Sequence, residues 1–137
     1  MSKITFDAKY DVLDEIREFV AEIARQVNFS EKEIYSIQLA ADEASTNIIE
    51  HAYAGIPDGK IEVECFVDKG VLTIVLHDHG KPFNPASVPE PNLKANLSER
   101  KIGGLGMYLM RKLMDEVTYN TSEEGGNTLT MVKRIGE

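Results

Sequence analysis

The chain has 137 residues, of which 42% are hydrophobic and 28% are charged, and its formal net charge is −8 with a pI near 4.9. This composition is typical of an ordinary globular protein, and the length suits a single domain over 1–137 with a sizeable core. No run of lysine and arginine is present to neutralise phosphates, so we expect no direct nucleic-acid binding.

Cys65 is the only cysteine, so an intramolecular disulfide is impossible within one chain. Its place in the alternating run over 61–67 predicts a small buried hydrophobe in a strand. No stretch approaches the roughly 18 apolar residues of a membrane span, and the first ten residues lack the apolar core of a signal peptide. We therefore expect a soluble cytoplasmic protein that does not enter a membrane.

The first third of the chain predicts a short strand and two helices. Apolar and β-branched residues over 3–6 favour the strand, and an apolar face repeating over 11–27 predicts the first helix. Ser30 and Glu33 form a capping-box pattern that opens the second helix. Glycine and proline end that helix at about Ala52.

The second helix carries two stripes of side chains. Its apolar stripe repeats at three- and four-residue steps and consists of Ile34, Ile37, Ala41, Ala44 and Ile48. A polar stripe beside it carries Glu43, Asn47 and then Glu50 or His51, because residues three and four apart lie above one another on a helix. A polar stripe alone is typical of a solvated face, and two later segments make it a candidate site.

Two hairpins and a third helix complete the predicted elements. Strands over 61–67 and 71–76 form the first hairpin, and strands over 117–121 and 128–135 form the last one. Between them lies a helix ending at about Met114, for which we expect Leu105, Leu109 and Leu113 to face inward. The order β, α, α, β, β, α, β, β predicts an α+β fold, a two-layer α/β sandwich with helices on one sheet face.

A long irregular segment separates the first hairpin from the third helix. Residues 77–104 contain four of the five prolines and show no clear period. Compact domains seldom keep such a segment without a use, and a lid or binding loop is the usual one, with disorder as the alternative.

The segment His77-Asp78-His79-Gly80 closes an apolar strand and allows three interpretations. His77 and His79 project to the same side of the strand and could bind a metal with a third ligand from elsewhere. Alternatively, Asp78 could accept a hydrogen bond from a ligand amine while Gly80 lets the backbone come close. In the third interpretation, Asp78 only caps local amides in a turn.

The turn Gly103-Gly104-x-Gly106 precedes the third helix and predicts an anion site. Free backbone amides and the helix dipole favour an anion at a helix N-terminus, and glycines let a phosphate approach. The turn is neither a Walker loop nor the dinucleotide-binding fingerprint. Together with the polar stripe and Asp78, it could surround one nucleotide. Asn47 would then suit Mg²⁺ and Glu43 would orient or deprotonate a hydroxyl nucleophile.

Three motifs resemble the GHKL, or Bergerat, ATP-binding fold: Glu43-x-x-x-Asn47, Asp78-x-Gly80 and Gly104-x-Gly106. The stretches DEASTNIIEHAY, DHGKPFNP and GGLGMYLM further resemble the small bacterial anti-sigma-factor serine/threonine kinases. The resemblance covers essentially the whole chain. It implies a stand-alone HATPase domain with a mostly antiparallel mixed sheet, covered on one face by three helices.

The resemblance also implies roles for individual residues. Asn47 would bind Mg²⁺, Glu43 would be the catalytic general base, and Asp78 would bind the adenine, with Thr128 nearby. Residues 84–102 would form the ATP lid. Further ATP-binding residues implied are His51, Gly80, Pro82, Phe83, Arg100 (a lid arginine reaching the γ-phosphate), Gly103, Gly104, Leu105, Gly106 and Met107. Pro82 stands where many relatives outside this subgroup have glycine, which predicts a stiffer adenine loop.

In function, the resemblance implies an Mg-ATP-dependent protein serine/threonine kinase that inhibits a sigma factor and so regulates transcription. Its substrate would be a STAS-type anti-anti-sigma protein that frees the sigma factor when unphosphorylated, and a homodimer is implied. The alternative is a catalytically silent, nucleotide-dependent protein-binding module in another bacterial signalling pathway. Glu43 favours catalysis, because a pure nucleotide sensor needs no base.

Overall fold

A computed structural model of the chain describes residues 2–82, 104–122 and 126–136. Its elements in chain order are β1 (Ser2–Asp7), a 3-10 turn η1 (Tyr10–Val12), α1 (Leu13–Gln26), α2 (Glu31–Asn47), a π-helical turn η2 (Ile48–Ala52), β2 (Lys60–Asp68), β3 (Val71–Asp78), α3 (Gly104–Leu113), β4 (Glu116–Ser122) and β5 (Gly126–Arg134). The predicted order of strands and helices is confirmed.

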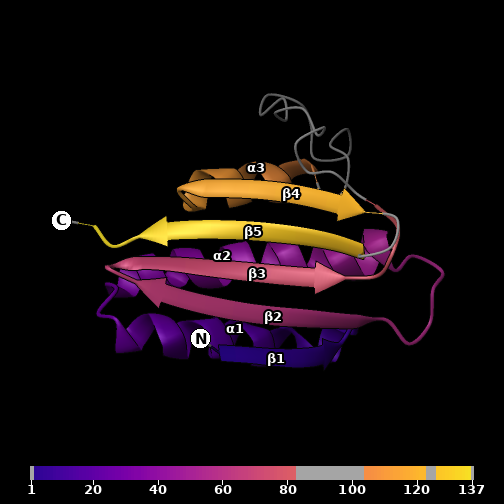
Figure 1. Cartoon of the computed structure of the whole chain (residues 1–137), viewed down its shortest axis with the longest axis horizontal. Helices are drawn as coiled ribbons and strands as arrows, with labels where there is room; N and C mark the ends of the chain where they lie inside the picture. Colours follow the sequence, from indigo (N-terminus) through magenta and orange to yellow (C-terminus); the bar gives the residue numbers. More distant parts are fainter. Residues whose placement is uncertain (1, 83–103, 123–125, 137) are drawn as a thin grey trace.

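The five strands form one sheet in the order β1-β2-β3-β5-β4. The three α-helices cover one face of this sheet, with α2 behind its centre and α1 and α3 on either side (Figure 1). The predicted two-layer α+β sandwich is therefore confirmed. Every pairing between the described strands is antiparallel. β3 and β4 run in the same direction, but β5 lies between them and pairs with both. The parallel pairing of an expected mixed sheet is absent from these strands.

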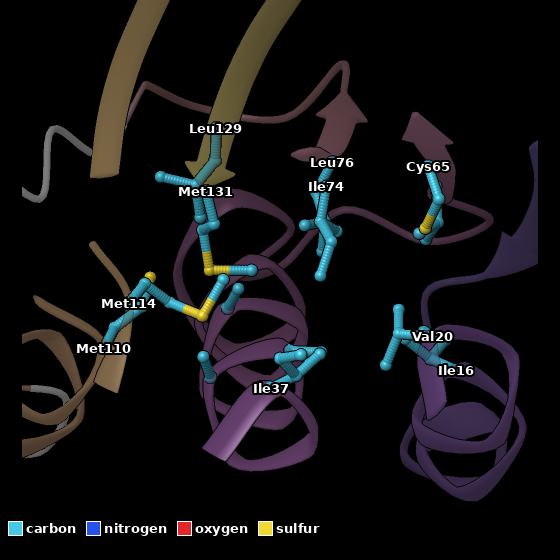
Figure 2. Packing of buried hydrophobic residues seen from close by; sticks show 14 of the residues in the cluster. Ile16, Val20, Ile37, Cys65, Ile74, Leu76, Met110, Met114, Leu129 and Met131 are labelled. Carbon is cyan, nitrogen blue, oxygen red and sulfur yellow. The ribbon is translucent and has the colours of Figure 1, made fainter. Parts of the chain in front are cut away.

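The core lies between the sheet and the helices. Alternate residues of the central strands point toward the helices, as the two-residue period of a strand requires. Those that are buried there are Ile61, Val63, Cys65, Leu72, Ile74, Leu76, Leu129 and Met131. They pack against Ile16 and Val20 of α1, Ile37 of α2 and Met110 of α3 (Figure 2). The predicted burial of Cys65 is confirmed.

Local signals place the ends of α2 and the first hairpin. The Ser30 hydroxyl accepts a 3.1 Å hydrogen bond from the Glu33 amide, and the Glu33 carboxylate accepts one of 2.9 Å from the Ser30 amide. This is the predicted capping box. Lys69 and Gly70 both have positive φ, the backbone of a tight turn whose twist matches the two strands that it joins.

The inward face of α3 differs from the prediction. Met110 and Met114 are buried, whereas Leu109 is 37% exposed and Leu113 only partly buried. The leucine stripe and the methionine stripe lie next to each other on the helix, so a rotation of about 100° exchanges them. The unbranched methionines fill the space against the sheet. Leucine and methionine are both hydrophobic, so hydrophobicity alone does not show which of the two stripes faces inward.

Among the described helices, none combines the length and apolar character needed to cross a bilayer.

Candidate functional site

Several segments that carry predicted site residues meet at one end of the sheet. There β3 ends at Asp78, β5 begins at Gly126, and η2 follows directly after α2. The arrowhead of β3 and the start of β5 lie side by side in Figure 1. β4 runs in the same direction as β3, so it begins at the opposite end of the sheet, where α3 ends. The start of α3 therefore lies toward the end of the sheet where β3 finishes (Figure 1).

Asn47 and Glu43 lie one helical turn apart on α2. Asn47 is 5% exposed, and its side-chain nitrogen donates a 2.8 Å hydrogen bond to the backbone carbonyl oxygen of Glu43. The amide nitrogen is thus used within the helix, and the oxygen Oδ1 is the atom available to a ligand. A hard amide oxygen of this kind suits Mg²⁺.

Glu43 is partly buried, and its environment changes its acidity. Burial raises the pKa of its carboxyl group, and the neighbouring charges of Asp42 and Glu50 raise it further. A carboxylate whose charge is poorly solvated takes up a proton more readily. This property suits a general base.

The helix that carries these residues ends in a π-helical turn, which was not predicted. The Tyr53 amide donates a 3.0 Å hydrogen bond to the carbonyl oxygen of Ile48, five residues earlier. Such turns often occur at functional sites. His51 lies in this turn and is partly buried, and the Ala52 carbonyl oxygen accepts a 2.7 Å hydrogen bond from the Lys81 amide.

Asp78 is 4% exposed at the end of β3, and its Oδ1 accepts a 2.8 Å hydrogen bond from the Gly80 amide. The local cap considered from the sequence therefore exists. The close approach expected at Gly80 exists as well. A Cβ atom on Gly80 would lie 2.2 Å from the Ala52 carbonyl oxygen, so only glycine fits between the strand end and η2. Pro82 follows and is exposed.

Asn127 is a member of this site that sequence reasoning missed. It is 2% exposed, and its side-chain nitrogen lies 2.8 Å from Asp78 Oδ1, 3.0 Å from the Gly80 carbonyl oxygen and 3.3 Å from that of Lys81. Its own Oδ1 accepts a 2.6 Å hydrogen bond from the Thr121 hydroxyl. The signal in the sequence that could have identified Asn127 is its place at the start of the last strand, directly after two glycines.

Thr128 is not brought to this side of the sheet. It pairs with His77, and its hydroxyl lies 3.0 Å from His77 Nδ1. Asp78 pairs with Asn127 instead, and consecutive strand residues face opposite ways. The register therefore places Asn127, and not Thr128, opposite Asp78, and a role for Thr128 near the adenine stays a prediction.

His77 and His79 lie on the same face as Thr128, with ring centroids 4.9 Å apart and the rings nearly perpendicular. Their predicted projection to one side is confirmed. Within the described part of the chain, no group of three histidine, cysteine, aspartate or glutamate residues is arranged to hold a metal.

The glycine motif lies in the first turn of α3, which begins at Gly104. The first four amides of a helix have no partner within it, so those of 104–107 are available for an anion. Other predicted ATP-binding residues, Phe83, Arg100 and Gly103, and the predicted lid over 84–102 lie outside the described residues, as do the side chains of Leu105 and Met107.

A family model described as "Histidine kinase-like ATPase domain" matches residues 6–133. The chain belongs to the histidine kinase-like ATPase family. Curated relatives of this domain include the serine-protein kinase RsbW of Bacillus licheniformis, 35% identical over 135 residues that cover 92% of this chain and 80% of the relative. The RsbW kinase of Listeria monocytogenes is 32% identical over 84% of this chain and 74% of its own. The anti-sigma F factor of Clostridium novyi is 27% identical over 85% and 81%.

Solved structures show that histidine kinase-like ATPase domains share this fold. The RsbU and RsbW domains of a Mycobacterium tuberculosis protein superpose with a TM-score of 0.69 at 19% identity, over all of this chain and 33% of that one. The catalytic domain of the histidine kinase ThkA superposes with a TM-score of 0.57 at 14% identity, over 98% of this chain and 97% of that one. The predicted GHKL fold is confirmed.

Proposed function

We propose that this chain is an Mg-ATP-dependent protein serine/threonine kinase that also acts as an anti-sigma factor. The relatives named serine-protein kinase and anti-sigma F factor support this proposal. The observation that carries it is the placement of Glu43, a partly buried carboxylate with a raised pKa, one turn before the buried Asn47.

The residues of the site fit a nucleotide and its metal ion. Asn47 presents an amide oxygen that would hold Mg²⁺, which when bound neutralises charge on the phosphates. The backbone amides at the start of α3 would donate hydrogen bonds to the phosphate oxygens. Asp78 would accept a hydrogen bond from the adenine amino group, and Gly80 keeps the strand end close to η2.

Glu43 would act on the substrate hydroxyl. Its carboxylate takes the proton of a serine or threonine hydroxyl, and that oxygen forms a bond to the γ-phosphorus of ATP. The bond from the γ-phosphorus to the bridging oxygen breaks, and its electron pair stays on ADP. Burial raises the pKa of Glu43, and a carboxylate with a raised pKa takes up the hydroxyl proton more readily.

The proposed partners are a sigma factor and a STAS-domain anti-anti-sigma protein, which is the phosphate acceptor. We propose that the chain acts in the cytoplasm as a homodimer. The net charge of −8 would favour a partner with a basic surface.

Phosphate transfer tests this proposal. The chain is incubated with Mg²⁺, ATP labelled on the γ-phosphate and the STAS-domain protein of the same organism. The expected result is label on a serine or threonine of that protein, and none with Glu43→Gln. Partner capture that depends on ATP but leaves no label, with the unaltered chain, would contradict the kinase and support the silent binding module.

A further inference from the structure

Every polar atom of the Asn127 side chain has a partner within the protein. The amide nitrogen has two hydrogens and faces three acceptors: Asp78 Oδ1, and the carbonyl oxygens of Gly80 and Lys81. The amide oxygen accepts from Thr121. With both hydrogens engaged and 2% of its surface exposed, Asn127 is built to hold its neighbours and not to donate to a ligand.

These contacts fix the orientation of the Asp78 carboxylate. Oδ1 receives two hydrogen bonds of 2.8 Å, one from the Gly80 amide and one from Asn127. Among the described residues, no donor is seen at Oδ2. Within the described part of the chain the carboxylate is therefore held through Oδ1, and Oδ2 is the oxygen that would accept from a ligand amine.

The backbone makes this arrangement possible. Gly126 has a φ of +80°, and a Cβ atom there would lie 2.3 Å from the Asp78 carbonyl oxygen. Glycine thus lets the start of β5 approach the end of β3 closely, and the register places Asn127 opposite Asp78. The same asparagine reaches the carbonyl oxygens beyond the strand, so it holds both the carboxylate and the turn that follows.

We propose that Asn127 is a positioning residue that determines purine specificity by orienting Asp78 toward the 6-amino group of the base. This inference rests on the proposed function, because it assumes that the site binds ATP. A purine without an exocyclic amino group donates no hydrogen bond to Asp78 Oδ2. The preference for ATP over such a nucleotide therefore reports the orientation of that carboxylate.

The test compares the affinities of two nucleotides, ATP and purine riboside triphosphate, which lacks the 6-amino group. Each is titrated calorimetrically with Mg²⁺ into the unaltered chain and into Asn127→Leu, which keeps the branched shape of the side chain and removes both of its polar atoms. We expect ATP affinity to fall at least about tenfold in the variant, as when a buried hydrogen bond is lost. Affinity for purine riboside triphosphate should fall much less, so the ratio of the two affinities moves toward one.

Two further variants keep the result interpretable. Asn120→Leu makes the same change at an exposed position on β4 and should leave the ratio unaltered. Thr121→Val removes only the hydroxyl that holds Asn127 Oδ1, so it should lower the ratio by a smaller factor. It also tests the inference if Asn127→Leu does not fold, as judged by its thermal unfolding.

The outcomes separate the inference from the proposed function. An equal loss of affinity for both nucleotides would make Asn127 merely structural and would overturn the inference, as would an unchanged ratio in the folded variants. An unaltered chain that binds both nucleotides equally would overturn the inference while leaving the kinase proposal standing. An unaltered chain that binds neither would overturn both.

Discussion

The side-chain nitrogen of Asn47 donates a 2.8 Å hydrogen bond to the backbone carbonyl oxygen of Glu43, so the nitrogen of that amide is engaged within α2 and its oxygen is the proposed Mg²⁺ ligand. The first prediction follows from this contact. Asn47→Ala removes the proposed Mg²⁺ ligand, so ATP affinity should lose its dependence on Mg²⁺. Calorimetric titration with and without Mg²⁺ measures this. Thr46→Ala, one residue earlier on α2, is the control, and an unchanged effect of Mg²⁺ in Asn47→Ala would remove Asn47 from its role.

Glu43→Gln should abolish phosphate transfer and leave ATP binding within about twofold, because the amide keeps the shape and loses the base. The size of the loss is expected to be about 100-fold or more. Single-turnover transfer measures it. Retention of transfer at the rate of the unaltered chain would exclude Glu43 as the base.

The pH dependence of transfer tests the same residue. The pKa of Glu43 is raised above its ordinary value of 4.5 by burial and then by Asp42 and Glu50. Since the base must be ionised, activity should fall as the pH drops through a midpoint above 4.5. Glu50→Gln removes one of the like charges and should move that midpoint to lower pH. A midpoint that shifts upward in this variant would contradict the assignment.

Gly80→Ala should destabilise the protein and weaken ATP binding. The added Cβ would lie 2.2 Å from the Ala52 carbonyl oxygen, and backbone on both sides must shift to relieve the contact. We expect the free energy of unfolding to fall by about 2 kcal/mol, measured by urea denaturation. Gly55→Ala is the matched control, because it has open space but a φ of +74° and should cost about 1 kcal/mol. Equal losses in the two variants would refute the close approach at Gly80.

Cys65 should be unreactive in the folded protein. Burial raises the pKa of its thiol to about 12, so almost no thiolate exists at pH 8. An aromatic disulfide reagent should modify it only after unfolding in urea, with one thiol per chain. Rapid modification of the folded protein at pH 8 would show that β2 opens to solvent.

Much of the fold is predictable from local patterns because the physical causes are local. The Ser30 and Glu33 side chains cap α2 through atoms three residues apart, and Lys69-Gly70 sets the turn between β2 and β3. The alternation around Cys65 fixes which face of β2 is buried. Each of these signals acts within a few residues, so the sequence shows it directly.

The features that the sequence did not predict depend on contacts between distant segments. Asn127 was missed because one residue of register decides which side chain of β5 joins Asp78, and that register is set across the sheet. The π-helical turn over 48–52 and the inward face of α3 likewise depend on packing against other elements. Glu43, Asn47 and Asp78 stand out as candidate site residues because they are polar groups next to apolar stretches of the sequence.

The most direct test of the central claim is a calorimetric titration of the purified chain with ATP, with and without Mg²⁺. The proposed function predicts micromolar binding that strengthens when Mg²⁺ is present. No detectable binding at millimolar ATP would contradict it, and would leave a histidine kinase-like ATPase domain that has lost its ligand.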